Sequence, residues 1–336
     1  MNGITKSLVI CLPLVLLVGC GGGGGNGGGP TTTVTAPPAQ ITSQNAPVIA
    51  GAVVQTALEG GGLGSFAGLG SGAGSVLTDP GSQLFSTLGG IHKSQTESLQ
   101  AKAQMGVLQA TIPEQMTNCI NAGSVTVSGS IANPATLSMN DTINLVFSGC
   151  DDGAGVVDGT YAMRITSFSG DLISGSFSFG VTVTLTNFQV VEGGETVTAD
   201  GDVSISLDTS TLPTLTVSVT ASSLSVSTGT SSQTLSSFSV TETVDDVTLA
   251  YTMDASGTLT SSAFTGSVTF ATAASLQGDG VGYAFSGELT ITGAGSASIS
   301  VLVLDNVFVR LEIDLNGDGT AEEIVDTTWD EVVAQT

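Results

Sequence analysis

Apolar and polar residues alternate along most of the chain after about residue 123. Aliphatic residues take every second position and Ser or Thr fills the positions between them, most clearly over 181–186, 203–207 and 215–219. Successive side chains of a strand point to opposite faces, so a period of two predicts strands with one aliphatic and one hydroxyl face. The β-branched content of these segments favours the same structure.

The turns between these segments are short and rich in Gly, Asp and Ser, and they predict roughly ten to thirteen strands. Because no helical segment intervenes, the sheet should be antiparallel. So many strands cannot stay flat. We therefore expect a mainly β fold, in which residues 118–336 form a large curled antiparallel sheet: a half-barrel, a barrel or a sandwich. The parity of the aliphatic positions reverses between Val219 and Leu224, which predicts a bulge or a turn there.

Residues 45–117 differ in character and predict a helical segment interrupted by a Gly-rich linker. Asn45 is a candidate N-cap and Pro47 falls in the first turn, so a short helix should begin here. Apolar residues recur at helical spacing over 79–106. We expect one or two N-terminal helices to pack on the apolar face of the sheet.

An apolar run over residues 8–18 follows one positive charge, Lys6. The run is too short to span a bilayer and is typical of the central part of a signal peptide. It ends in the residues LVGC (17–20), which resemble the lipobox of bacterial lipoproteins. That resemblance implies a signal peptide over 1–19 and a Cys20 that is acylated, for example with palmitate. The alternative is an ordinary signal peptide with a chance cysteine.

Residues 20–44 contain the lipidated Cys and a tether rich in Gly, Pro and Thr. Several acyl chains together hold a protein stably at a membrane. The resemblance thus implies that a lipid anchor joins the chain to a membrane of the bacterial cell envelope. Gly21 follows the cysteine, where an aspartate would resemble an inner-membrane retention signal of enterobacteria-like systems. Its absence favours the outer membrane, on either the periplasmic or the surface face.

Charge is sparse and one-sided: 29 Asp and Glu oppose 5 Lys and Arg, for a net charge of −24. Such a surface repels nucleic acid and anionic lipid head groups, so nucleic acid is excluded as a partner. His92 is the only histidine, and no Gly-x-Ser-x-Gly occurs. The chain therefore lacks the usual means of activating a nucleophile. The acidic residues cluster at turns and aromatic residues are few, which argues against glycoside hydrolysis. We expect no enzymatic activity.

Cys119 and Cys150 are the two cysteines left after the signal peptide and the lipobox. An even pair in an oxidising compartment predicts a disulfide. It would close a loop of about 30 residues and contribute roughly 3–4 kcal/mol in the chain-entropy model. The alternative is a metal-binding or catalytic thiol pair, which the scarcity of histidine disfavours.

The segment DLNGDGT near the C-terminus is the one candidate metal site, with calcium as the candidate cofactor. Calcium prefers several oxygen ligands on a bent loop. The candidate ligands are Asp314, Asn316, Asp318, Thr320 through its carbonyl, and Glu322. The flanks are strand-like and the twelfth loop position carries no glutamate, so the loop is not an EF-hand. A plain hairpin turn, with Asn-Gly and Asp-Gly supplying positive φ, is the first interpretation, and a calcium-binding hairpin is the second.

Two longer segments carry a second resemblance. FSGCDDGAGVVDGTYAMRI (147–165) and the ending DLNGDGTAEEIVDTTWDEV resemble a group of uncharacterised proteobacterial lipoproteins. These share a lipobox, a Phe-x-x-Cys followed by glycine-punctuated strands, and a C-terminal Asp/Gly turn leading to Thr-Trp. The resemblance covers most of residues 119–333. It implies envelope localisation and fold, and it implies no activity.

Two functions fit these features. The first is a non-enzymatic envelope lipoprotein with a structural or interaction role and an envelope protein as partner. The alternative is a carrier that holds an apolar ligand, such as an acyl chain, in the concavity of the sheet. A ligand-sized cavity between the N-terminal helices and the sheet would favour the carrier.

Overall fold

The structure is a computed structural model of the chain. It describes residues 36–62, 111–132, 138–153, 155–171, 176–229, 231–280 and 282–335. The predicted signal peptide (1–19), Cys20 and the predicted helix over 79–106 lie outside the described residues, as does most of the predicted linker. The described residues belong to one compact unit, Ala36–Thr336.

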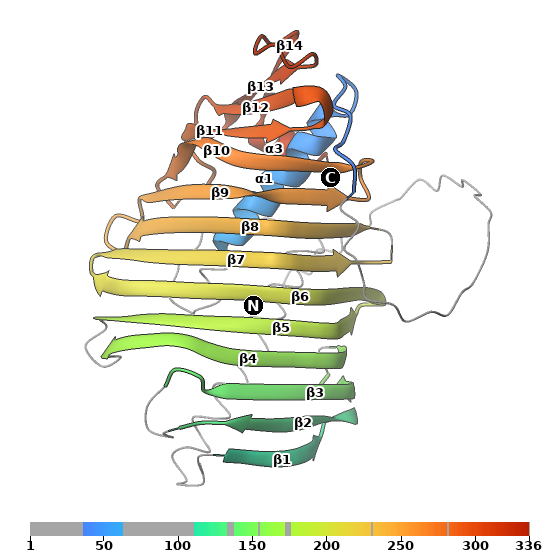
Figure 1. Cartoon of the computed structure of the whole chain (residues 1–336), viewed down its shortest axis with the longest axis vertical. Coiled ribbons are helices and arrows are strands. Elements are labelled where there is room, and N and C mark those ends of the chain that lie inside the picture. Colours follow the sequence, from blue (N-terminus) through green and yellow to red (C-terminus); the bar gives the residue numbers. More distant parts are fainter. Residues whose placement is uncertain are drawn as a thin grey trace, which may run out of the picture. The chain divides into compact units, whose positions relative to one another are not determined.

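In the described part of the chain, fourteen antiparallel strands form one sheet in which each strand pairs with its neighbours in chain order (Figure 1). The strands are β1 (Thr111–Asn118), β2 (Ala122–Ser130), β3 (Thr142–Asp151), β4 (Val156–Asp171), β5 (Ser176–Glu192), β6 (Glu195–Thr211), β7 (Thr214–Ser227), β8 (Ser232–Asp245), β9 (Tyr251–Ser261), β10 (Ser267–Gly278), β11 (Ser286–Thr292), β12 (Ser298–Val303), β13 (Phe308–Asp314) and β14 (Glu323–Thr328). Strands β1 and β14 stand at the two ends of this order, so the sheet is open. The predicted fold class is confirmed. The strand number exceeds the predicted range, because the shortest strands offer few positions for alternation.

The long strands carry the two faces that the alternation predicts. The inner face of the sheet is the one on which Val203, Ile205 and Leu207 of β6 lie buried. On the outer face, hydroxyl groups of neighbouring strands bond to one another, as Thr182 Oγ1 and Ser204 Oγ do at 2.8 Å. Further pairs of this kind are Ser169–Ser178, Ser218–Thr241 and Ser225–Thr234. These bonds satisfy polar groups that would otherwise depend on water.

The predicted reversal of parity after Val219 is a β-bulge. Gly201 of β6 pairs with Leu224 of β7, and the register shifts before Ser204 resumes the ladder. Gly201 has φ +132°, and a Cβ there would overlap the Ser223 carbonyl oxygen. Only glycine fits this position, and the bulge brings Leu224 back to the inner face.

Helix α1 (Ala46–Gly62) lies against the sheet and contacts β7–β9, β12 and β13 (Figure 1). Asn45 directly precedes α1, as predicted, but its side chain bonds backwards: Oδ1 accepts from Thr42 N (2.8 Å) and Nδ2 donates to Gln40 O (2.9 Å). Residues 49–57 of α1 are all buried. A helix buried on every side is a core element rather than a surface helix with one apolar stripe.

Residues at the end of the predicted tether also pack against the sheet. Ser267 N donates to Pro37 O (2.9 Å), and Ala39 N donates to Ser267 O (2.7 Å). Ala39 and Ile41 are buried. The chain therefore joins the compact unit from Ala36 onward, beside the first residue of β10.

Helix α3 (Trp329–Val333) closes the described part at its C-terminal end, and its N-terminus carries a capping box formed by Thr328 and Glu331. The Trp329 indole is buried and stacks on Tyr283, with ring centroids 5.3 Å apart. Its Nε1 donates to the carbonyls of Ala284 (3.2 Å) and Asp305 (3.3 Å). Trp329 thereby ties the loop before β11 and the β12–β13 turn together.

Candidate functional site

The loop between β13 and β14 is built around one carboxylate. Asp314 is 7% exposed, and its Oδ1 accepts hydrogen bonds from Gly317 N (2.7 Å) and Asn316 N (3.2 Å). Its Oδ2 accepts from Gly319 N (2.8 Å). Burial alone would raise the pKa of Asp314, but the backbone N–H groups together lower it. Gly317 and Gly319 both have positive φ, as the hairpin-turn interpretation requires.

The other candidate ligands surround this carboxylate. Asn316 Oδ1 accepts from Asp318 N, and Asp318 Oδ1 accepts from Thr320 N, both at 2.8 Å. Glu322 Oε2 accepts from Leu315 N (2.6 Å), and its Oε1 accepts from the Asn316 side-chain amide. The loop is thus a chain of side-chain-to-backbone bonds that fixes each acidic group in place.

Three of the five predicted calcium ligands come together in the structure. One carboxylate oxygen each of Asp314, Asp318 and Glu322 lies within 4.8 Å of the other two. Hard oxygen donors at this spacing can hold a divalent cation. The carboxylates of these three residues already accept backbone or amide hydrogens, so hydrogen bonds within the loop hold its described conformation. The turn is observed, and calcium binding stays a prediction.

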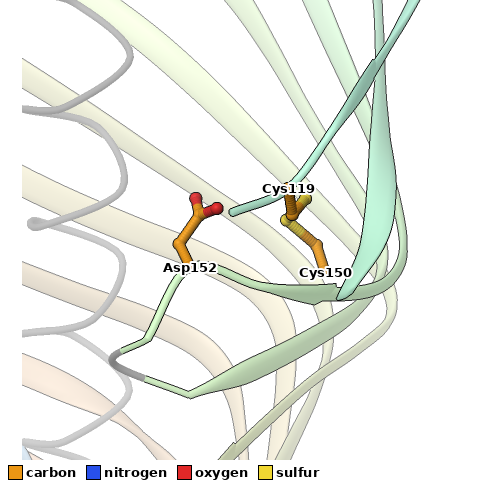
Figure 2. A group of neighbouring side chains, drawn as sticks. All are labelled: Cys119, Cys150 and Asp152. Atoms are coloured by element: carbon orange, nitrogen blue, oxygen red, sulfur yellow. A yellow bond between two sulfur atoms is a disulfide. The ribbon is translucent and has the colours of Figure 1, made fainter. Parts of the chain in front are cut away.

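The predicted disulfide is present and joins Cys119, directly after β1, to Cys150 in β3 (Figure 2). The two Cα atoms are 5.4 Å apart. Asp152 lies beside the bridge, and its Oδ1 accepts from Ile120 N (3.0 Å). Because both sulfur atoms are bonded to each other, neither is a thiolate that could bind a metal. The bridge spans β2 and fastens the edge strand β1 to the sheet.

Sequence reasoning missed three polar groups on the inner face. Glu242 of β8 is 8% exposed and stands between its cross-strand partners Val217 and Met253, both buried. Burial raises the pKa of Glu242 to about 7. The hydroxyl groups of Tyr161 and Tyr251 are buried without a hydrogen-bond partner. Burial raises the pKa of Tyr161. Burial, with smaller contributions from the negative charges of Glu242 and Asp279, raises the pKa of Tyr251 to about 12.

A signal for Glu242 was present in the sequence. It shares its parity along β8 with Phe238 and Val240, which are buried on the inner face. A strand keeps one face at alternate positions, so parity alone places the Glu242 carboxyl in the core.

The described residues leave little space between α1 and the sheet. A cavity of ≈ 10 Å³ remains there, lined by apolar side chains of α1, β10, β11 and β12 and by Trp329. A water needs about that much room and also polar partners. Of the described residues, apolar side chains of the protein itself therefore occupy the space beneath α1.

No family model, curated protein or solved structure matches the chain. Neither described helix is long and apolar enough to cross a membrane. In the described residues, the groups with the spacing of a metal site are the β13–β14 loop and the disulfide with Asp152. His92 lies outside the described residues. What the protein does must therefore be inferred from the chemistry of the chain itself.

Proposed function

We propose that this chain is a lipid-anchored lipoprotein of the bacterial cell envelope, held at the outer membrane, whose β domain has a structural or interaction role and no enzymatic activity. The lipobox-like residues 17–20 support the anchor. In the sequence, Cys20 precedes Ala36, the residue at which the compact unit begins. The partners are the membrane, through this anchor, and an envelope protein.

The structural role is supported chiefly by the small space that the described residues leave between α1 and the inner face. The remaining cavity there is ≈ 10 Å³, far below the ~300 Å³ or more of a typical ligand pocket. On the outer face, Ser and Thr side chains bond to one another across the strands. Within the described residues, the inner face under α1 and the outer face between these strands are thus occupied by contacts of the domain with itself.

Electrostatics also favour the anchor over direct adsorption of the domain. The chain has 29 acidic and 5 basic residues, and an acidic surface is repelled by anionic lipid head groups. Attachment would then depend on acyl chains, and the acidic surface suits a protein partner of opposite charge.

The experiment is metabolic labelling of cells with an alkyne analogue of palmitate, followed by membrane fractionation. The full chain should be labelled and sediment with the outer membrane. Cys20→Ala should abolish both label and sedimentation. Cys11→Ala is the matched control, because that cysteine lies in the predicted signal peptide and should leave both unchanged. Equal labelling of Cys20→Ala and the unaltered chain would refute the proposal.

A carrier function is the second candidate, and the buried polar groups of the inner face favour it. The unpartnered hydroxyls of Tyr161 and Tyr251 could orient the polar end of an apolar ligand such as an acyl chain. Native mass spectrometry after mild extraction tests this. A copurified lipid would support the carrier, and a bare chain mass would leave the structural role.

A further inference from the structure

The outer face of the sheet changes character at the β12–β13 hairpin. Val303 and Val309 pair with each other and are buried on the inner face. Leu302 and Phe308 take the alternate positions and therefore lie on the outer face. Leu304 N donates to Phe308 O (3.0 Å), which places Leu304 beside Phe308. Over the long strands Ser and Thr fill most outer positions, whereas this hairpin puts large apolar side chains there.

Three side chains of the hairpin are about half exposed: Leu304 (44%), Val307 (48%) and Phe308 (49%). Together with Leu302 they are called the hairpin patch below. Residues 301–309 are apolar at both parities apart from the two at the tip. Strands that are apolar at both parities are typical of sheets covered on both faces, yet here the inner face alone is buried. Neighbouring apolar side chains left at a surface mark an interaction site, which isolated ones do not.

Hydrogen bonds hold the backbone of the hairpin patch in place. Asp305 Oδ1 accepts from Val307 N and Phe308 N, both at 2.8 Å. The Asp305 carbonyl accepts from Trp329 Nε1 (3.3 Å), and the Val307 carbonyl accepts from Trp329 N (3.0 Å). The exposed side chains therefore stand on a turn that is fastened to helix α3. A surface organised in advance loses little conformational freedom when a partner covers it.

The surroundings of the hairpin patch are acidic. Residues 282–335, which contain it, include ten Asp or Glu and one basic residue, Arg310. Arg310 pairs with Asp326 at 2.7 Å, so its charge is already compensated. On the other side of the hairpin, Glu288 of β11 is the cross-strand partner of Leu302. A second copy of this chain and an anionic membrane both carry negative charge, so both would be repelled here.

We propose that the hairpin patch is the docking surface for an envelope protein whose own contact surface is apolar at its centre and ringed by Lys or Arg. This inference rests on the interaction role proposed above and names the surface that performs it. The apolar side chains supply the buried centre of a small interface. The acidic groups around them select a partner of opposite charge.

Site-specific photocrosslinking of the full chain in intact cells tests the proposal. The photoreactive residue p-benzoylphenylalanine replaces Phe308 or Leu304, and the matched control position is Val146. Val146 is 46% exposed on the outer face of β3, but its cross-strand partners are Thr126 and Thr160. Phe308 and Leu304 should give the same discrete protein adduct, several-fold stronger than at Val146. Mass spectrometry should place the crosslink on an apolar residue of the partner with Lys or Arg nearby.

Charge reversal separates docking from chance contact. Glu312 of β13 shares the outer face with Phe308. In a chain that carries the photoreactive residue at Phe308, Glu312→Lys should weaken the adduct several-fold, because it repels a basic partner. Glu114→Lys is the matched control, since Glu114 is an exposed residue of β1 at the other end of the strand order, and it should leave the adduct unchanged.

Several results would overturn the proposal. The adduct could be a second copy of the chain, a lipid or another segment of the same chain, it could form equally at Val146, it could be insensitive to Glu312→Lys, or no adduct could form at Phe308 and Leu304. None of these results bears on the lipid anchor, because metabolic labelling reads acylation of Cys20 separately. Conversely, the expected adduct on a chain whose Cys20 is not acylated would keep the docking surface and refute the anchor.

Discussion

The Cys119–Cys150 bridge should determine how well the first edge of the sheet holds together. We consider replacing both cysteines by serine. The bridge spans 31 residues, and the chain-entropy model gives a loss of about 3–4 kcal/mol in the free energy of unfolding for such a loop. Strand β1 cannot replace this contribution by packing, because its residues are almost all exposed and Met116 is 71% exposed.

The assay combines urea denaturation with hydrogen exchange. The double variant should lose about 3–4 kcal/mol of stability, and β1 and β2 should lose protection before the central strands do. Reduction of the unaltered chain should reproduce both effects, and the same reductant should leave the double variant unchanged. A loss below about 1 kcal/mol with protection of β1 intact would show that pairing with β2, rather than the bridge, holds this edge.

Three further predictions concern single groups. The pKa of Glu242 is about 7 in the folded chain and 4.5 in the unfolded chain, so its contribution to the free energy of unfolding is fully present below pH 4.5 and is lost as pH rises through 7. Relative to the unaltered chain, Glu242→Gln should therefore raise the free energy of unfolding by about 3 kcal/mol at pH 8 and leave it unchanged at pH 4, as measured by urea denaturation. Gly201→Ala should cost about 2 kcal/mol or more in the same assay, since its Cβ would overlap the Ser223 carbonyl. Gly194→Ala, at an open position of positive φ, should cost less, and equal losses would contradict the steric argument. If the β13–β14 loop is a turn, millimolar calcium should leave the melting temperature unchanged; a rise that Asp318→Ala abolishes would establish a calcium site.

Local patterns in the sequence predicted much of the fold. The alternation of aliphatic and hydroxyl residues over 203–207 predicts a strand, and the structure places those residues in β6. The parity reversal before Leu224 predicts a bulge, and the structure places its extra residue in β7 itself, opposite Gly201 of β6. The disulfide followed from counting, because Cys119 and Cys150 were the only partners left for each other. These features depend on neighbours along the chain or on composition.

Other features depend on which segments meet in space. Nothing near Ala39 in the sequence indicates that it lies buried beside Ser267, more than two hundred residues away. Helix α1 was expected to pack on the apolar face of the sheet, but its sequence does not indicate that every residue from 49 to 57 is buried. Trp329 likewise finds its hydrogen-bond acceptors in two separate turns. Such contacts are set by tertiary packing, which periodicity does not reveal.

The proposed function requires an acylated Cys20 on a mature envelope protein. Mass spectrometry of the N-terminal peptide, from protein purified out of the membrane fraction, tests this requirement. We expect the mature chain to begin at Cys20, with a thioether-linked diacylglyceryl group and an acylated α-amine. A chain that retains residues 1–19, or begins at Cys20 without lipid, would contradict it.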